Sequence, residues 1–407
     1  MSRLFRPLPG LALAAAAVLS ARASDCTQTS VGRVPLNDLG AGLYLGQFQG
    51  GLYPGGANLP PAAHAAEGLS RAAFIGPLDL TGQPDPAGKY VLLSIGMSNT
   101  TQEFCSAGSG LPCDPYTFMG QAAAHPLVNH TSLEIVNGAA GGQAASTWDS
   151  PADPNYDRVR DTRLAPRGLG EAQVRAVWLK VANPGPSVSL PAPNADAYTL
   201  VTQMGNIVRA AKVRYPNLEI VFVSSRIYAG YASSTLNPEP YAYESGFAVK
   251  WLIEAQINQM AGGPIDPRAG DLDTATVAPW IAWGPYLWAD GTTPRSDGLT
   301  WVCADFSPDG THPATSGRQK VGTRLLQFML ASPFARPWFR LAGACSADFD
   351  ASGTVTTADI TAFLGAWFAD LAAGGTVADF DLSGATNTAD ISMFLSAWFA
   401  AVAGGCP

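Results

Sequence analysis

The sequence predicts an α/β protein followed by a small all-α segment, and three observations carry this prediction. Between Leu59 and Leu341, short β-rich runs alternate with helical patterns, which is typical of a mostly parallel sheet with helices on both faces. Gly and Pro are frequent, at 43 and 32 of 407 residues, which indicates long ordered loops. After Cys345 the pattern changes to a duplicated loop–helix unit.

Short apolar runs bounded by turn residues predict four strands, at residues 90–95, 132–137, 176–182 and 219–225. Amphipathic patterns predict helices over residues 197–215 and 243–260. Residues 263–308 show few clear elements and many turn residues, so we expect a long functional loop there.

Composition limits the partners of the chain. Hydrophobic residues make up 47% of it, which is ample for a sizeable core, and charged residues make up only 14%, which argues against a disordered polyelectrolyte. The formal net charge of −8 argues against nucleic acid or an anionic membrane as the main partner.

The first residues are typical of an export signal. Arg3 and Arg6 precede an apolar run over residues 11–19 and an Ala-Arg-Ala cleavage site at residues 21–23. We therefore expect a signal peptide over residues 1–24, a catalytic domain over 25–341 and a tail domain over 345–406. No segment is apolar for long enough to span a membrane, and the mature protein is expected to be secreted, to the extracellular space, the cell surface or the periplasm.

All six cysteines follow the cleavage site, so an oxidising compartment would let them pair. Six cysteines allow 15 pairings, and their positions favour one set. The favoured pairs are Cys105–Cys113, Cys345–Cys406 and Cys26–Cys303.

The duplicated unit begins at Asp348 and again at Asp379, and each copy carries D-x-D-x-S-G and a further Asp at loop position twelve. Calcium takes six to eight oxygens from such a twelve-residue loop, with Gly at position six. The alternative is a polar turn capping a helix. The predicted ligands of the first loop are Asp348, Asp350, Ser352, the Thr354 carbonyl, Thr356 and Asp359. Those of the second are Asp379, Asp381, Ser383, the Ala385 carbonyl, Asn387 and Asp390.

Behind each loop, an identical apolar stripe lies on one helix face, so the two helices can bury each other. The segment resembles a type I dockerin, bracketed by Cys345 and Cys406. The resemblance implies two structural calcium ions and docking onto a cohesin-like or cell-surface partner. Two positions depart from the expected calcium loop: Ser stands at position five in place of Asp, and Asp stands at position twelve in place of the Glu of EF-hands. Because Ser leaves fewer carboxylates, we expect weaker affinity for calcium.

Ser98 follows the first predicted strand in Gly-Met-Ser-Asn, a place where open α/β sheets bind ligands. A Gly-x-Ser turn with no chemistry is the alternative. A nucleophilic serine needs a base, and His312 stands three residues after Asp309, so one turn can present both. A capping aspartate beside an exposed histidine is the alternative there. His64, His125 and His130 lie in loop-like stretches without an adjacent acid and are interpreted as surface or core residues.

Two further strand-end features supply candidate oxyanion donors. Gly141 and Gly142 follow the second predicted strand, and Asn183 follows the third. Backbone amides at the glycines, the Ser98 N–H and the Asn183 side chain could each donate where charge develops. A flexible glycine turn and a strand-ending Asn are the alternatives.

In this order, Ser98, Gly142, Asn183 and Asp309 with His312 resemble the four blocks of the SGNH (GDSL-type) hydrolases, and "GGQAASTW" is similar to the sialate-O-acetylesterase branch. The resemblance implies a flavodoxin-like α/β/α fold, an ester hydrolase without a catalytic cofactor, and an acylated carbohydrate or other ester as substrate. Met97 and Val181 depart from the family pattern. These two departures are the main support for the alternative hypothesis, that the chain is an inactive calcium-dependent binding or anchoring protein.

Overall fold

A computed structural model of the chain describes residues 23–105, 111–341, 345–350, 352–373, 377–380 and 386–404. The predicted signal peptide lies almost wholly outside these residues. Within them, no helix is both long enough and apolar enough to cross a membrane.

The main sheet has five parallel strands in the order β4-β3-β5-β6-β7. Numbered along the chain, this is the order 2-1-3-4-5 of flavodoxin-like folds, so the predicted α/β/α class is confirmed. The strands are β3 (Tyr90–Gly96), β4 (Leu133–Asn137), β5 (Val174–Lys180), β6 (Ile220–Val223) and β7 (Trp280–Trp283).

Every residue of β3, β5, β6 and β7 is buried. Strands that are covered on both faces read as continuous apolar runs rather than alternating ones, and β3, β5 and β6 were recognisable in the sequence as such runs. The fourth predicted strand, β4, is only partly buried. The register places Gly96, the last residue of β3, opposite Lys180, the last residue of β5.

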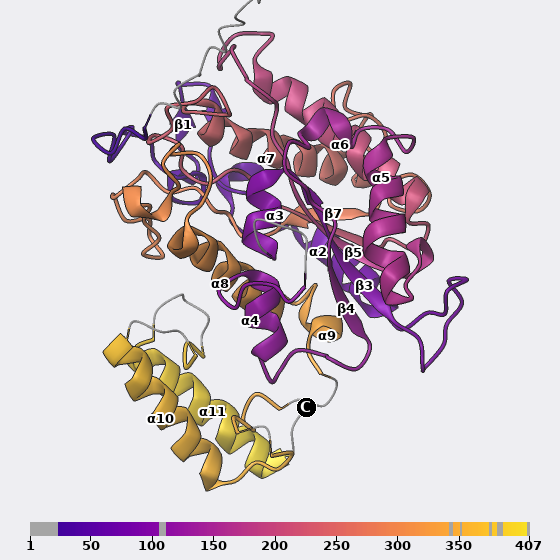
Figure 1. Cartoon of the computed structure of the whole chain (residues 1–407), viewed down its shortest axis with the longest axis vertical. Helices are drawn as coiled ribbons and strands as arrows, with labels where there is room; N and C mark the ends of the chain where they lie inside the picture. The colour runs from indigo at the N-terminus through magenta and orange to yellow at the C-terminus, as the bar shows by residue number, and fades with distance from the viewer. Residues whose placement is uncertain are drawn as a thin grey trace, which may run out of the picture.

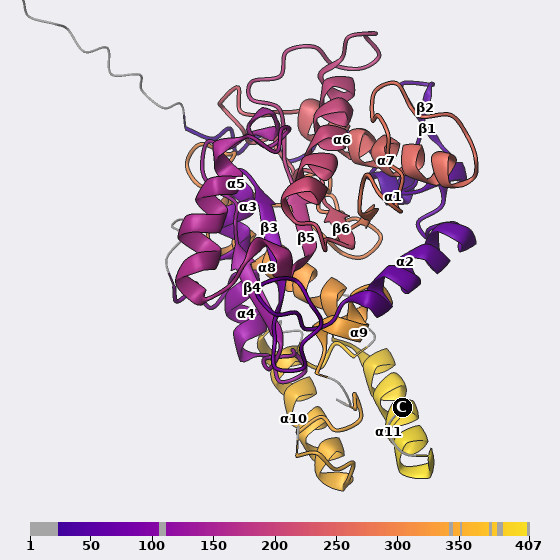
Figure 2. The ribbon, with the colours of Figure 1, turned by 90° about the vertical axis from the view of Figure 1, so that its right-hand side faces the viewer.

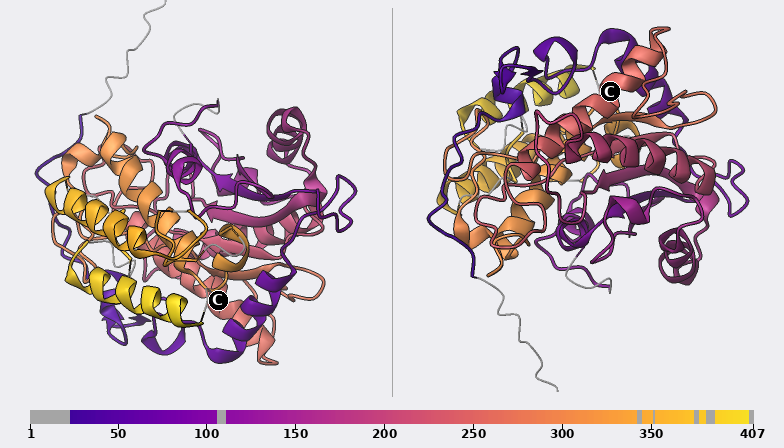
Figure 3. Two further views of the ribbon diagram at one scale, coloured as in Figure 1. Left: turned by 90° about the horizontal axis from the view of Figure 1, so that it is seen from below. Right: turned by 90° about the horizontal axis from the view of Figure 1, so that it is seen from above.

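Helices cover both faces of the sheet (Figure 1, Figure 3). The chain passes from β3 to β4 in one direction and from β5 through β6 to β7 in the other, so right-handed crossovers place the two sets of connecting helices on opposite faces. On one face α3 (Ser98–Phe104) and α4 (Phe118–Ala124) pack against α8 (Thr315–Ala331). On the other, α6 (Asp196–Arg214) packs against α7 (Tyr241–Met260).

The remaining elements of this domain are short or peripheral, except for one helix near the N-terminus. A two-stranded antiparallel ribbon precedes that helix. The elements are α1 (Leu36–Leu39), β1 (Leu43–Tyr44), β2 (Phe48–Gln49), α2 (Ala62–Phe74), α5 (Pro154–Val159) and α9 (Arg336–Phe339).

Two expectations about this domain were wrong. The stretch over residues 263–308 contains β7, which completes the sheet. His64 lies in α2 rather than in a loop, and its ring is buried 4.9 Å from the ring of Trp280.

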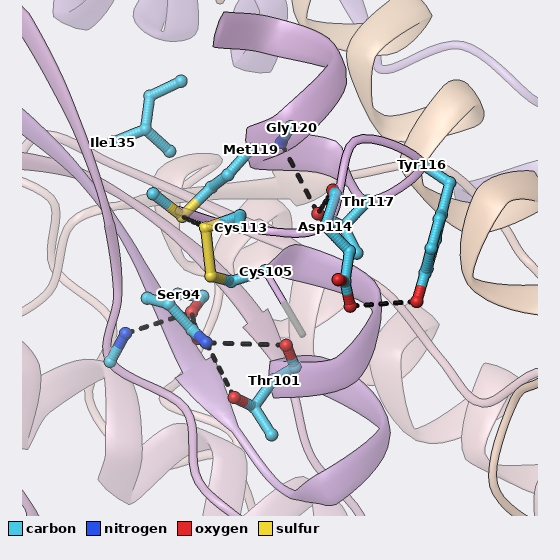
Figure 4. The surroundings of a disulfide bond; sticks show 12 residues. Ser94, Thr101, Cys105, Cys113, Asp114, Tyr116, Thr117, Met119, Gly120 and Ile135 are labelled. Carbon is cyan, nitrogen blue, oxygen red and sulfur yellow. Dashed lines mark hydrogen bonds between the residues drawn. A yellow bond between two sulfur atoms is a disulfide. The ribbon is translucent and has the colours of Figure 1, made fainter. Parts of the chain in front are cut away.

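Two of the predicted disulfides are present, Cys26–Cys303 and Cys105–Cys113. Figure 4 shows the second, which ties the end of α3 to the chain before α4, with Met119 beside it. Cys345 is also disulfide-bonded, and its predicted partner Cys406 lies outside the described residues.

The tail forms α10 (Thr357–Ala373) and α11 (Thr388–Gly404), and it lies at the end of the molecule that carries α4, α8 and α9 (Figure 1, Figure 2). Its core is separate from that of the α/β domain. The rings of Phe363 and Phe394, equivalent positions of the two copies, stack 4.2 Å apart. The duplicated stripe therefore packs one helix against the other only in part, because its outermost rings, Phe368 and Phe399, are exposed at 64% and 62%.

Candidate active site

Ser98 lies at the carboxyl edge of the sheet, where β3 ends and α3 begins. The turn requires glycine at position 96, because a Cβ there would lie 2.2 Å from the carbonyl oxygen of Lys180. Ser98 is the first residue of α3, so its backbone N–H has no partner within the helix. The sequence thus places both a hydroxyl and a free amide donor at this edge.

His312 reaches Ser98 from the loop before α8. Its Nε2 lies 2.8 Å from Oγ of Ser98, and its Nδ1 lies 2.5 Å from Oδ2 of Asp309. A carboxylate can only accept, so Nδ1 carries the proton and Nε2 is free to accept from the serine hydroxyl. The three side chains that the sequence singled out form one hydrogen-bonded chain.

The turn that carries the histidine is held rigidly. Oδ1 of Asp309 accepts from the backbone N–H groups of Thr311 and His312, at 2.9 and 3.0 Å. Gly310 has φ +64°, and a Cβ there would lie 2.0 Å from the carbonyl oxygen of Tyr231. The D-G-T-H sequence therefore specifies this turn through both its Asp and its Gly.

These contacts also determine the charge of Asp309. Partial burial raises the pKa of its carboxyl, but the hydrogen bonds from the His312 side chain and from the two backbone groups outweigh burial and lower that pKa to about 2. Asp309 is therefore anionic at any pH at which an imidazole can act as a base.

One residue of the site was missed in the sequence. Asn99, beside the serine, is almost fully buried, and its Nδ2 donates to the carbonyl oxygen of Thr311 at 3.1 Å. It ties the start of α3 to the histidine loop, so it fixes the distance between Ser98 and His312. Its position in "GMSN" was the available signal.

The glycine loop after β4 passes beside Ser98. Ala140 N–H donates to the carbonyl oxygen of Gly96 at 3.1 Å, and a Cβ on Gly141 would lie 4.0 Å from Cβ of Ser98. Gly142 follows with φ +76° and open space where a side chain would be. The loop leaves room beside the serine, and the role of the Gly142 N–H as an oxyanion donor stays a prediction.

Asn183 lies beyond the end of β5, and its Nδ2 donates to the carbonyl oxygen of Asp196 at 2.8 Å. The backbone carbonyl oxygen of Asn183 accepts from Nδ2 of Asn237 at 2.6 Å. Across the described ranges, no hydrogen bond joins Asn183 to Ser98. Because an amide NH2 has two donors, one remains for an oxyanion, and that role also stays a prediction.

A buried ion pair lies behind the nucleophile. Nζ of Lys180 is 2.5 and 2.6 Å from the two carboxylate oxygens of Glu103, and both side chains are fully buried. Burial raises the pKa of Glu103 and lowers that of Lys180, and their mutual attraction opposes both shifts. Thr100 Oγ1 donates to the Lys180 carbonyl at 2.6 Å. The pair joins α3 to the end of β5, and no sequence signal linked two residues 77 positions apart.

The first tail loop gathers carboxylates at one point. One oxygen from each of Asp348, Asp350 and Asp359 lies within 4.8 Å of the others. Oxygens on opposite sides of one calcium ion are ~4.6–5.2 Å apart, so this donor set fits calcium. Gly353, at loop position six, has φ +84° as the turn requires. In the second loop Asp379, Asn387 and Asp390 are described, whereas Asp381, Ser383 and Ala385 lie outside the described residues.

The second loop also contacts the α/β domain. Nε2 of Gln327, on α8, donates to Oδ2 of Asp379 at 2.9 Å. Asp390 is fully buried, and its Oδ2 accepts from the N–H of Asn387 at 2.8 Å. The predicted ligand at position one of this loop therefore lies at the interface between the tail and α8.

No family model and no curated protein matches the chain. Among solved structures it is similar to a protein of Arabidopsis thaliana, at 12% identity and TM-score 0.33 over 60% of this chain and 98% of that one. It is also similar to a GDSL-like lipase from Parabacteroides merdae, at 11% identity and TM-score 0.32 over 62% of this chain and 97% of that one. A salicylyl-acyltransferase from a tetracycline biosynthetic pathway is similar at 13% identity and TM-score 0.32, over 62% of this chain and 58% of that one. These likenesses are too slight to determine a function.

Proposed function

We propose that the chain is an exported serine hydrolase that cleaves ester bonds, with acyl groups on carbohydrate as its substrates. The hydrogen-bonded chain from Ser98 through His312 to Asp309 is the observation that carries the proposal. It has the nucleophile, base and orienting acid of a serine hydrolase in mutual contact.

In the proposed reaction, Oγ of Ser98 attacks the ester carbonyl while Nε2 of His312 accepts its proton. The imidazolium then returns that proton to the leaving alcohol, and an acyl-enzyme remains on Ser98. Water, deprotonated by His312, then attacks this acyl group, and the imidazolium returns the proton to Oγ of Ser98 as the bond to the acyl group breaks and the acid leaves. Asp309 holds the ring in the required tautomer and stabilises its positive charge. The N–H groups of Ser98 and Gly142 and the amide of Asn183 are the proposed oxyanion donors.

Acylated carbohydrate as the substrate, export and the docking tail are finer parts of the proposal. The likeness of "GGQAASTW" to sialate-O-acetylesterases and the dockerin-like tail support the substrate class. The N-terminal export pattern and the disulfides support secretion. In the tail, the oxygens of both loops would hold calcium, which supplies the positive charge that keeps their carboxylates together. A cohesin-like or cell-surface protein is the proposed partner.

The alternative of an inactive anchoring protein rests on Met97 and Val181. Hydrolysis of p-nitrophenyl acetate and of acetylated xylo-oligosaccharides separates the two. We expect turnover that Ser98→Ala abolishes and that Ser316→Ala, a substitution of an exposed serine four residues after His312, leaves unchanged. A folded protein that hydrolyses neither class of ester would contradict the proposal.

A further inference from the structure

A cavity lies away from Ser98, between β2, the start of α6, the second half of α7 and the loop over residues 264–268. Its volume is about 510 Å³, within the range of small-molecule sites. Its wall combines aromatic rings with charged groups. The residues that characterise it are Phe48, Tyr198, Trp251, Glu254, Asp266 and Arg268.

The aromatic wall is a packed stack of rings. Tyr198 and Trp251 lie nearly parallel, with centroids 5.1 Å apart and an interplanar angle of 21°. The ring of Phe48 meets Trp251 edge-on at 5.7 Å. All three side chains are only partly buried. Their mutual packing fixes the rings before any ligand arrives, which reduces the entropy lost on binding.

Hydrogen-bonding groups border these rings. Oδ1 of Asp266 accepts from the N–H groups of Arg268 and Ala269, both at 2.8 Å, so Oδ2 remains an acceptor. Glu254 forms an ion pair with Lys250 at 3.5 Å. The guanidinium carbon of Arg268 lies 3.9 Å from the Tyr198 ring centroid, and Arg268 forms no ion pair in the described part of the chain. Its N–H groups are donors at the cavity.

From this arrangement we propose that the cavity is a binding site for a neutral saccharide. A pyranose ring has apolar C–H faces that pack on aromatic rings and hydroxyl groups at its edge that both donate and accept. The cavity offers that combination of rigid rings, carboxylate acceptors and a guanidinium donor. Because Lys250 pairs with Glu254, the remaining charges of the lining are one carboxylate, Asp266, and one guanidinium, Arg268, and this balance favours a neutral ligand.

The site is separate from the catalytic one. Tyr198 and Trp251 lie on α6 and α7, whereas Ser98 lies on α3, and His312 lies in the loop before α8. These two pairs of helices cover opposite faces of the sheet. A saccharide in the cavity would therefore hold the protein on a glycan while another part of that glycan, or another chain, reaches Ser98. The inference goes beyond the proposed hydrolysis, and it stands even if Ser98 is inert.

The test uses the full chain carrying Ser98→Ala, titrated with cellohexaose, xylohexaose and mannohexaose by calorimetry and by saturation-transfer NMR. We expect at least one hexasaccharide to bind. Tyr198→Ala and Arg268→Ala should each weaken its affinity at least about tenfold, equal to about 1.4 kcal/mol. Phe74→Ala, which removes an aromatic ring exposed at 64% on α2, is the matched control and should leave the affinity unchanged.

Two results would overturn the inference: no binding of any of the three saccharides, or binding that neither substitution weakens. Because Arg268 is exposed, we expect Arg268→Ala to fold. Its saccharide affinity therefore tests the inference even if Tyr198→Ala does not fold. In a chain with Ser98 intact, Tyr198→Ala should hydrolyse p-nitrophenyl acetate at the unaltered rate. Loss of saccharide binding with retained esterase activity separates this site from the catalytic one.

Discussion

Ser98 and His312 are 214 positions apart in the sequence, yet Oγ of Ser98 lies 2.8 Å from Nε2 of His312. The contact brings together the end of β3 and the loop before α8, two segments that the flavodoxin-like topology delivers to one edge of the sheet. Asn99 fixes their separation by donating to the Thr311 carbonyl. The fold therefore preorganises the nucleophile and its base.

Asp309→Asn should lower turnover about 10⁴-fold, because an amide cannot hold the required imidazole tautomer. The folded state lowers the pKa of Asp309 from 3.8 to about 2. Its carboxylate therefore stabilises the fold fully above about pH 4, and this contribution is lost as the pH falls through 2. The free energies of unfolding of the wild type and of Asp309→Asn should be measured between pH 2 and 6. The stability advantage of the wild type should decrease toward acid pH. An advantage that grows toward acid would contradict the assigned shift.

Asn183→Ala should lower kcat about 10²–10³-fold if its free N–H stabilises the oxyanion. Asn237→Gly is the matched control, because it removes the other hydrogen bond of this loop without removing an oxyanion donor. Glycine is chosen because Asn237 has φ +63°. If both variants lose thermal stability equally and keep kcat, Asn183 only holds the loop through Asp196.

Much of the fold was predictable because buried parallel strands read as continuous apolar runs. The run "YVLLSIG" is an example, and its strand leads directly to Ser98. The strand β7 was missed because its four residues lie within a stretch rich in Gly and Pro that gives no period to recognise. The helix α2 was missed as well, and with it the buried position of His64.

The candidate triad was predictable because Asp309 and His312 are close in sequence and Ser98 stands at a strand end. Lys180 and Glu103 were not, because only the fold pairs two charges 77 positions apart. The hydrogen bond from Asn183 to the carbonyl oxygen of Asp196 could not be predicted either, because an Asn at the end of a strand has many available partners.

Lys180→Met should destabilise the protein by about 3–5 kcal/mol, because it leaves the Glu103 carboxylate buried and unpaired. The double variant with Glu103→Gln should be less destabilised than Lys180→Met alone. Urea denaturation of the wild type, the two single variants and the double variant measures this coupling. Strictly additive losses would show that the pair does not act as a unit.

Calcium should bind the full chain at two ions per molecule and raise the melting temperature above that measured with a chelator. Without a cation, the carboxylates of Asp348, Asp350 and Asp359 repel one another. Asp348→Asn should reduce the calorimetric stoichiometry from two to one, and Asp161→Asn, an exposed carboxylate on the α/β domain, should not. Esterase activity should persist in chelator. No calcium uptake at millimolar concentration would leave the repeat as two capped helices.

The central claim is that Ser98 is a nucleophile activated by His312, and covalent labelling with a fluorophosphonate tests it most directly. Intact-protein mass spectrometry should show one adduct per chain, located by peptide mapping at Ser98. Labelling should be absent in Ser98→Ala, at least about 10³-fold slower in His312→Ala, and unchanged in His130→Ala, which removes an exposed histidine. A folded wild-type protein that takes up no label, or a Ser98→Ala variant that labels normally, would contradict the account.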